Sequence, residues 1–452
     1  MQGWQQHERA TAALLASWHQ LDPGQPVRLA KPTSNLFRPR ASTETRGLDV
    51  AGLDGVIEID VSARTAQVQG MCTYEDLVEE TLDHGLVPTV VPQLRTITLG
   101  GAVTGLGIES TSLRLGLPHE AVEEMEILTG AGELVAARAD NEHRELFAAF
   151  PNSYGSLGYA IRLKISLEPA PQHVRLRHVE FLNATELAAA IEAIAETGQY
   201  EGIRVDAVDG TSFDPTELYL TLAEFVDGAG PTSDYGGDQI YYRSIRTRTA
   251  DVLTMRDYLW RWDTDWFWCS AAFGAQNKLV RRIWPRRYRR SDVYHRLVHL
   301  DSKIGLSQLL DRVKAIPGRE RVIQDIEVPL DRLPEFLAWF DREIGMRPVW
   351  LCPLRTQQRW PTYPLEPNKT YVNVGFWGTV VVPADSEPGA VNRQIETEVH
   401  RLGGHKSLYS ESFYDPVDFS SLYDTAGLDR IRKQYDPDSR LSSLYEKAVR
   451  NS

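Results

Sequence analysis

Glycines and hydroxyl residues crowd the stretch from Pro92 to Ser112, PQLRTITLGGAVTGLGIESTS. Glycines let a backbone approach a ligand closely, and successive N–H groups in such a loop form a concave site for phosphate oxygens. The stretch therefore predicts a loop wrapped around a diphosphate, whereas the simpler alternative is a glycine-rich turn in an ordinary domain. The dinucleotide fingerprint GxGxxG and a P-loop are both absent from it. The expected contacts are Pro92, Leu94, Thr96, Thr98, Gly100, Gly101, Gly105, Gly107, Ile108, Ser110 and Ser112.

Two further loops have a similar composition and also adjoin predicted strands. The first contains Thr33, Ser34, Asn35 and Leu36 after a short apolar run. The second runs from Asn152 to Gly158 and feeds a predicted strand that contains Ile161. Asn, Ser and Gly are typical of tight turns, so either loop alone is as consistent with a plain turn as with a binding site. Three such loops in one N-terminal region favour a cofactor cradle over three coincidental turns.

Two carboxylates stand close together in the predicted strand Ile323-Gln324-Asp325-Ile326-Glu327. Side chains alternate along a strand, which puts Asp325 and Glu327 on one face. Carboxylates this close raise each other's pKa, so that one can keep a proton near neutral pH and act as an acid. On residue pattern alone, a strand with one solvated face is the simpler interpretation.

Composition narrows the class of protein. The chain has 452 residues, 42% hydrophobic and 25% charged, with a formal charge of −13. These values are typical of a soluble globular protein and argue against nucleic-acid binding as its role. Cys72, Cys269 and Cys352 are far apart, which favours reduced thiols over disulfides. The histidines show no metal-ligand spacing, so we expect no metal site.

The N-terminal 21 residues are expected to form an amphipathic helix rather than a signal peptide, and no stretch is apolar enough to span a bilayer, so a cytoplasmic protein is expected. An aromatic run, residues 258–268, precedes six arginines at positions 281, 282, 286, 287, 289 and 290. Basic residues beside Trp and Tyr suit an anionic membrane surface. A solvated helix flank next to buried aromatic residues explains the pattern equally well.

The combined pattern resembles the FAD-binding domain of the vanillyl-alcohol oxidase / p-cresol methylhydroxylase flavoproteins. The residues that carry the resemblance are Thr98-Leu99-Gly100-Gly101, the segment 158–161 and Tyr435-Asp436-Pro437. Segments 99–110, 322–329 and 348–353 are similar to the 24-dehydrocholesterol reductase branch, and the overall pattern is similar to the actinobacterial flavoproteins that reduce 10-methylene to 10-methyl fatty acyl chains in tuberculostearic acid synthesis.

The resemblance implies an α+β fold in three segments. Residues 1–170 form a two-part FAD-binding domain of the p-cresol methylhydroxylase type. Residues 171–405 form an α+β substrate domain with an antiparallel sheet over the flavin, and residues 406–452 return to the first domain. Many members carry a His or Cys that bonds the flavin, but the loop at Thr33 has neither, so non-covalent FAD is expected.

The implied activity is reduction of a lipid carbon–carbon double bond with NADPH. In the family, the strand face of Asp325 and Glu327 looks at the flavin ring, which makes them the first acid candidates, with Asn373 on the next strand as a hydrogen-bonding partner. Tyr409 is a candidate proton donor or flavin contact. His405 and Lys406 are candidates to neutralise the reduced flavin or are surface residues, while His119 and Cys352 are expected to be structural.

The implied partners are a lipid or fatty acyl substrate, an anionic membrane touched peripherally and a lipid methyltransferase. Two other enzymes stay open, a sterol side-chain reductase and an FAD-dependent oxidase of a small alcohol or sugar. An alternative of another class is a lipid-binding protein that has lost its flavin.

Overall fold

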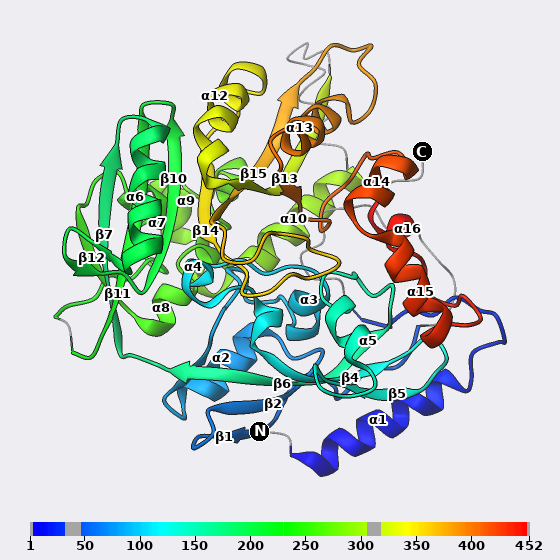
Figure 1. Ribbon diagram of the computed structural model, residues 1–452. Coiled ribbons are helices and arrows are strands. Elements are labelled where there is room, and N and C mark those ends of the chain that lie inside the picture. Colours follow the sequence, from blue (N-terminus) through cyan, green and yellow to red (C-terminus); the bar gives the residue numbers. More distant parts are fainter. Residues whose placement is uncertain (1–2, 32–46, 229, 305–317, 450–452) are drawn as a thin grey trace.

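Two antiparallel sheets organise the molecule, one above the other in the view of Figure 1. The computed structural model describes residues 3–31, 47–228, 230–304 and 318–449. The first sheet lies in the N-terminal part of the chain and the second begins at His173, directly after Pro169 ends the first. This is the two-part α+β architecture that the sequence predicts, with an antiparallel sheet in the second part.

The first sheet is packed between helices on both faces, as Figure 1 shows with α1 below it and α2, α3 and α5 above it. Its strand order is β1-β2-β6-β4-β5, and β3 pairs with β6. Strands β1 and β2 form a hairpin, and Thr73, which caps α2, accepts a hydrogen bond from the Asp76 amide. The strands are β1 (Val56–Asp60), β2 (Thr65–Gln69), β3 (Leu86–Pro88), β4 (Val122–Leu128), β5 (Leu134–Ala137) and β6 (Tyr159–Pro169). The helices are α1 (Trp4–Trp18), α2 (Tyr74–Leu82), α3 (Leu99–Thr104), α4 (Ser112–Leu115), η1 (Pro118–Ala121) and α5 (Arg144–Ala149).

The second sheet runs β12-β7-β11-β10-β14-β15-β13-β16, with every neighbour antiparallel. Its strands are β7 (His173–Phe181), β10 (Ala207–Asp214), β11 (Glu217–Val226), β12 (Ala250–Thr254), β13 (Arg319–Pro329), β14 (Val349–Leu354), β15 (Tyr371–Val381) and β16 (His405–Lys406); a small separate pair is β8 (Gln199–Tyr200) and β9 (Ile203–Arg204). The helices between the strands of this sheet include α6 (Ala184–Thr197), η5 (Leu330–Arg332), α12 (Leu333–Glu343) and α13 (Ala390–Arg401).

The two faces of this sheet belong to different hydrophobic cores. Val322, Ile326 and Val374 lie in the core formed with α6, α12 and α13, which we call the outer face. Trp350 and Cys352 lie in the core shared with the first sheet, which we call the inner face. Because side chains alternate along a strand, each strand supplies one set of residues to each core.

Short helices fill the space on the inner face and the chain then returns to the first sheet. They are α7 (Tyr241–Ser244), α8 (Met255–Leu259), η2 (Asp263–Asp265), η3 (Cys269–Phe273), α9 (Lys278–Ile283), η4 (Arg286–Tyr288) and α10 (Ser291–Ile304). The C-terminal helices are α14 (Pro416–Leu422), α15 (Thr425–Tyr435) and α16 (Leu444–Ala448). The Ala131 amide donates to the Tyr435 carbonyl at 2.9 Å and Lys447 Nζ to the Gly155 carbonyl at 2.7 Å, so the C-terminal segment packs on the first domain.

Candidate active site

Asp325 and Glu327 lie together on the inner face of the second sheet. In the register of β13 and β15, Asp325 stands opposite Gly375 and Glu327 opposite Asn373. Asn373 in turn stands opposite Cys352, which belongs to the inner core. Directly opposed residues share a face of a sheet. The sheet therefore turns two carboxyl groups and one amide toward the first domain.

The Asp325 carboxyl is poised to exchange a proton near neutral pH. Part of its surface is accessible, yet burial raises its pKa to about 6, against hydrogen bonds from Asn373 and Tyr409 that favour the charged form. The Asn373 side-chain amide donates to Asp325 Oδ1 at 3.1 Å. A Cβ at Gly375 would collide with the same oxygen, so the glycine opposite leaves room for the carboxyl. A pKa near the working pH is the property a general acid needs.

The Glu327 carboxyl is fully buried and favours its protonated form. Ser407 Oγ donates to Glu327 Oε1 at 2.9 Å, while Oε2 finds no hydrogen-bond partner in the part of the chain that the structure describes. Burial is the main reason that the pKa of Glu327 lies well above its usual value, and the nearby charge of Asp325 adds to it. Glu327 is thus a neutral acid two residues from Asp325.

Tyr409 connects this acid pair to the sheet. Trp377 Nε1 donates to the Tyr409 hydroxyl at 2.8 Å, and Tyr409 hydrogen-bonds Asp325, which lowers the pKa of that carboxyl. Burial first, and then the charge of Asp325, hold the pKa of Tyr409 well above its usual value, so the phenol keeps its proton. With its oxygen accepting from Trp377, the tyrosine can direct its own proton toward Asp325.

An aromatic wall adjoins this acid group; it consists of Phe267, Trp268, Trp350 and Trp377. Phe267 stacks on Trp377 with ring centroids 4.3 Å apart, and Trp268 lies 5.4 Å from Trp377. Trp266 and Phe267 adopt φ values of 45° and 58°, a left-handed conformation that bulky residues rarely take. Such strain costs of order 1–3 kcal/mol per residue and often marks functional sites. Here it presses Phe267 onto Trp377, beside Tyr409.

The two residues of β16 lie on different sides of the sheet. His405 stands opposite Glu327 and packs its ring edge-on to Tyr363 at 5.0 Å. Burial lowers the pKa of His405 to about 3, so its ring is neutral. Lys406 Nζ instead donates to Glu396 Oε1 at 2.5 Å on α13, on the outer side. Neither residue is a surface residue, and Lys406 does not join the acid group.

His119 and Cys352, which the sequence analysis assigns to structural roles, are both fully buried. His119 packs edge-on against Trp360 at 4.5 Å, and burial lowers its pKa to about 3. Cys352 lies in the inner core. Both placements agree with packing roles.

The two glycines at the start of α3 make hydrogen bonds and close contacts within the protein. The Gly100 amide donates to the Gly70 carbonyl at 2.9 Å, and the Gly101 amide to Thr98 Oγ1 at 3.1 Å, which makes Thr98 the cap of α3. A Cβ at Gly100 would come within 2.6 Å of the Gly70 carbonyl, so close packing requires the glycine. The expectation that these two amides donate to a diphosphate is therefore wrong, because both are already bonded.

The two serines of the same loop are also engaged within the protein. Ser110 Oγ donates to Glu109 Oε1 at 2.5 Å and pairs with the Tyr258 hydroxyl at 2.6 Å. Ser112 Oγ accepts from the Glu109 amide at 3.1 Å. The Ser110 hydroxyl therefore joins the loop to the second domain. The Ser112 hydroxyl accepts within the loop, and its expected contact with a phosphate stays a prediction.

The other expected cofactor contacts are spread over three places. The Ile161 side chain packs in the core between α1 and the first sheet. Thr33, Ser34, Asn35 and Leu36 lie outside the described residues. Thr96 is half-buried in the glycine loop, and the buried members of that loop are Pro92, Leu94, Gly105, Gly107 and Ile108.

Buried polar atoms without a protein partner show where a polar ligand fits. The side-chain amides of Gln93 and Asn152 and the hydroxyls of Ser153 and Ser156 have no hydrogen-bond partner among the described residues. Buried polar groups are normally bonded, so these atoms suit the sugar, phosphate and ring heteroatoms of FAD. The backbone N–H of Asn152 donates to the Val103 carbonyl at 3.2 Å, which puts this loop against the C-terminal end of α3.

The same loop has an unusual backbone. Asn152 and Tyr154 have φ values of 56° and 52°, and Gly158 has a φ of 130°. A Cβ at Gly158 would lie 2.5 Å from the Leu128 carbonyl, so no other residue fits there. The sequence of this loop indicates Gly158 but not the three polar side chains, because their burial cannot be read from composition.

A buried ion cluster, also missed from the sequence, ties the glycine loop to the second sheet. Arg261 is fully buried and donates to Glu109 Oε1 at 3.0 Å and to Asp209 Oδ2 at 3.2 Å. Trp262 and Trp350 donate their indole N–H groups to the same Asp209 oxygen at 2.8 and 3.1 Å. The cluster fixes the position of the loop relative to the inner face.

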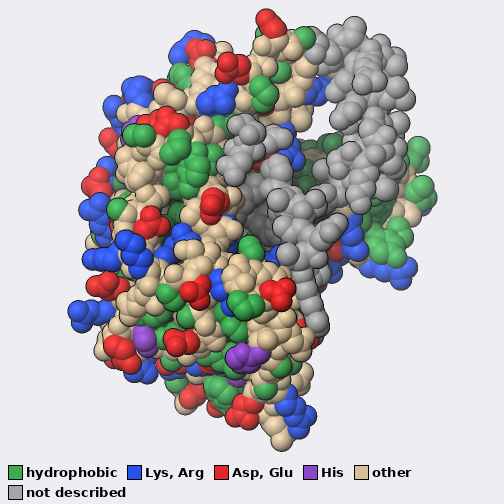
Figure 2. All heavy atoms as spheres, turned by 90° about the vertical axis from the view of Figure 1, so that its right-hand side faces the viewer, with side chains coloured by type: hydrophobic (Ala, Val, Ile, Leu, Met, Phe, Trp, Pro, Cys, Tyr) green, Lys and Arg blue, Asp and Glu red, His purple; other side chains and the backbone are tan. Residues whose placement is uncertain are grey.

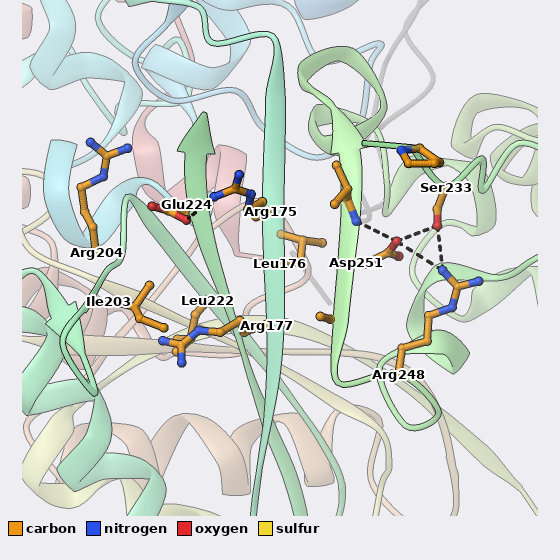
Figure 3. Close-up of a pocket in the computed structure, with 13 residues that line it drawn as sticks. Arg175, Leu176, Arg177, Ile203, Arg204, Leu222, Glu224, Ser233, Arg248 and Asp251 are labelled. Carbon is orange, nitrogen blue, oxygen red and sulfur yellow. Dashed lines mark hydrogen bonds and ion pairs between the residues drawn. The ribbon is translucent and has the colours of Figure 1, made fainter. Parts of the chain in front are cut away.

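A pocket of about 530 Å³ lies elsewhere, on the outer face near β7, β11 and β12 (Figure 3). Strand β12 is at the opposite end of the sheet from β13, so the pocket is remote from Asp325. Its arginines are matched by carboxylates, in the pairs Arg175–Glu224, Arg177–Glu201, Arg204–Asp206 and Arg248–Asp251. The pocket therefore carries little net charge to attract an anion.

The described ranges contain neither a metal-binding cluster nor a membrane-spanning helix. No group of three His, Cys, Asp or Glu side chains is placed to hold a metal ion. Within the same ranges, no helix has the length and apolar character needed to cross a membrane.

Comparison with known proteins shows similarity to FAD-binding proteins and to sterol reductases. Residues 10–138 match the model of the FAD binding domain family. A Delta(24)-sterol reductase homolog of Caenorhabditis elegans is 24% identical over 424 residues, covering 88% of this chain and 77% of that protein. The Delta(24)-sterol reductases of Rattus norvegicus and Arabidopsis thaliana are also 24% identical, covering 87% and 89% of this chain and 75% and 76% of their own lengths. The N-terminal part of this chain is therefore an FAD-binding domain.

Proposed function

We propose that this FAD-dependent oxidoreductase reduces a carbon–carbon double bond in a lipid, with NADPH as its electron donor. The substrate we favour is a 10-methylene fatty acyl chain, which becomes a 10-methyl chain. The observation that carries the proposal is a group of acidic side chains, Asp325 with Glu327 and Tyr409, in which the pKa of Asp325 lies near neutral pH. This group lies beside the aromatic wall, on the sheet face turned toward the FAD-binding domain.

An isolated alkene has no carbonyl to polarise it, so reduction requires a positioned acid in a site that excludes water. Reduced FAD supplies the hydride for one alkene carbon. Asp325 supplies the proton for the other carbon, and Asn373 holds the carboxyl in place at 3.1 Å. Tyr409 keeps its proton and hydrogen-bonds Asp325, so it stabilises the carboxylate that remains after the transfer.

The cofactor is held by side chains of two loops in this proposal. Gln93 from the glycine loop and Asn152, Ser153 and Ser156 from the later loop offer buried donors and acceptors that lack partners among the described residues. The loop at Thr33 is expected to contribute as well. Since none of these side chains is a His or Cys, FAD is held without a covalent bond.

The aromatic wall gives the apolar substrate a surface to pack on. Trp268 and Trp377 are half-buried, while Phe267 is held behind them by its stacking on Trp377. Aromatic side chains bury a large area and exclude water from the neighbouring acid group. A lipid methyltransferase that makes the methylene branch would be the partner that provides this substrate.

A sterol side chain is the second candidate substrate. Its support is the similarity to Delta(24)-sterol reductases over most of the chain. Both substrates present an isolated alkene on an apolar molecule, so the acid group serves either one.

The test is lipid mass spectrometry of a host that makes this protein, with and without a supply of methylene-branched lipid. The proposal expects a methyl-branched product that depends on the supply and disappears with Asp325→Asn. A Delta(24)-sterol offered in parallel tests the second candidate. No loss of the methylene lipid, together with reduction of the sterol, would overturn the fatty acyl assignment.

A further inference from the structure

Helix α9, residues Lys278–Ile283, has its apolar and charged side chains reversed. Leu279 is 77% exposed and Ile283 is 81% exposed, while Arg281 between them is only 2% exposed. Residues four apart share a face of a helix, and Arg281 lies on the opposite face. A surface helix normally turns its apolar face inward, so this orientation requires a specific cause.

Strong polar contacts fix α9 in this orientation. Arg281 Nη1 donates to Asp265 Oδ1 at 2.7 Å, and its Nε donates to the Gly237 carbonyl at 2.9 Å. Asn277 Oδ1 accepts from the Leu279 amide at 2.9 Å and caps the helix. A roll that buried Leu279 and Ile283 would leave the Arg281 guanidinium and the Asp265 carboxylate without their buried partners, which is costly.

Basic residues surround the two exposed aliphatic side chains. Lys278, Arg282, Arg286 and Arg287 are all exposed. Arg286 pairs with Asp234 at 2.8 Å, whereas the other three have no ion-pair partner within the described ranges. On the face of the molecule that Figure 2 shows, basic and acidic side chains are interspersed. In a chain with a formal charge of −13, this local excess of positive charge stands out.

We propose that residues 278–288, which we call the docking segment, bind the surface of an anionic lipid bilayer. Leu279 and Ile283 enter the interface between headgroups and acyl chains, and the neighbouring Lys and Arg side chains contact the anionic headgroups. Tyr288, 43% exposed at the end of the segment, suits the same interface. Single exposed apolar residues are ordinary, but two on one helix face, flanked in the chain by exposed basic residues, match an anionic membrane.

The docking segment is connected to the candidate active site. Asp265, which anchors Arg281, immediately precedes the left-handed turn of Trp266 and Phe267. Phe267 stacks on Trp377, whose indole bonds Tyr409. Docking would thus bring the bilayer next to the turn that carries the aromatic wall. The inference rests on the proposed function only in that a lipid substrate is drawn from the membrane.

Vesicle sedimentation tests the apolar part of the segment. The full-length, FAD-loaded protein is mixed with vesicles of phosphatidylcholine alone or with an equal part of phosphatidylglycerol. We expect binding to the anionic vesicles, reduced at least about tenfold in Leu279→Gln/Ile283→Gln, since burial of the two aliphatic side chains favours binding. Val417→Gln is the matched control, because Val417 is 78% exposed on another helix, and it should bind like the wild type.

Charge variants test the basic part. Arg282→Gln/Arg287→Gln should lose about fivefold in affinity per residue for anionic vesicles, and added salt should weaken wild-type binding. Arg342→Gln/Arg430→Gln, which removes two exposed arginines elsewhere, should change little. Equal binding of the wild type to neutral and anionic vesicles would overturn the assignment to an anionic surface.

Further outcomes separate this inference from its rivals. Wild-type protein that binds no vesicle, or a double variant that binds as the wild type does, overturns the docking segment. A dimer that Leu279→Gln/Ile283→Gln converts to a monomer, without vesicle binding, assigns the segment to self-association and also overturns it. Vesicle binding with no alkene reduction supports the inference and removes the proposed function; turnover of detergent-dispersed lipid without vesicle binding does the reverse.

Discussion

The indole N–H of Trp377 donates a hydrogen bond to the hydroxyl oxygen of Tyr409 across 2.8 Å. This contact joins β15 to the segment after β16, and it fixes the tyrosine beside Asp325. Trp377 also carries the stacked Phe267 on its ring. The Trp377 side chain therefore orients Tyr409 beside Asp325 and also forms part of the aromatic wall next to them.

Tyr409→Phe should shift the pH dependence of the reaction. The Tyr409 hydroxyl lowers the pKa of Asp325, which is about 6 in the wild type. Because Asp325 is the acid in the proposed mechanism, kcat/KM should fall as the pH rises through that value. Without the hydroxyl, the midpoint should move to higher pH while the maximal rate decreases. A profile with an unchanged midpoint would disconnect Tyr409 from Asp325; the flavin absorbance shows whether the variant keeps FAD.

Asp325→Asn should abolish most of the turnover and leave the flavin in place. General acid catalysis typically contributes about 10²–10⁴-fold, so kcat should drop by that order. Asp331→Asn changes an exposed carboxylate just after β13 and should retain wild-type rates. Turnover that survives in Asp325→Asn would remove this carboxyl from the mechanism.

Glu327→Gln should make stability less dependent on pH. The folded-state pKa of Glu327 is raised well above 4.5, so its protonated form stabilises the fold fully below pH 4.5. That stabilisation is lost as the pH rises through the folded-state pKa. In urea unfolding, the free energy of unfolding of the variant should therefore rise relative to that of the wild type as the pH increases. Glu387→Gln, at an exposed ion pair, provides the comparison; the same pH trend there would assign the effect to general charge.

Arg261→Met should destabilise the protein strongly. It would leave Glu109 and Asp209 buried without their cation, and breaking a buried pair in this way typically costs about 3–5 kcal/mol. Arg256→Met removes a surface arginine that pairs with Glu79, where a loss of about 0–1 kcal/mol is typical. Urea unfolding of both variants measures the difference, and similar losses would contradict a structural role for the cluster.

Local signals in the sequence were sufficient for several elements. Alternation in residues 323–327 predicts the shared face of Asp325 and Glu327, and the register with β15 confirms it. The helix expected in the first 21 residues forms as α1, and the strand expected to contain Ile161 forms as β6. These features depend on neighbours in the chain, which a sequence displays directly.

Features that depend on distant partners were not predictable in the same way. Glycine composition does not show that the Gly100 amide is already bonded to Gly70, so the expected phosphate contact was wrong. The meeting of Arg261 with Glu109 joins residues 152 positions apart. The aromatic run and the basic residues after it were equally compatible with burial and with a membrane surface. The structure packs Phe267 of the run against Trp377 and turns Leu279, beyond the run, outward.

The most direct measurement is anaerobic mixing of the purified, FAD-loaded protein with NADPH, followed by a methylene-branched lipid. The flavin absorbance should bleach with NADPH and recover when the lipid is added, with formation of the methyl-branched product. Bleaching by a simple alcohol or sugar but not by NADPH, or a reduced flavin that no alkene reoxidises, would contradict the account.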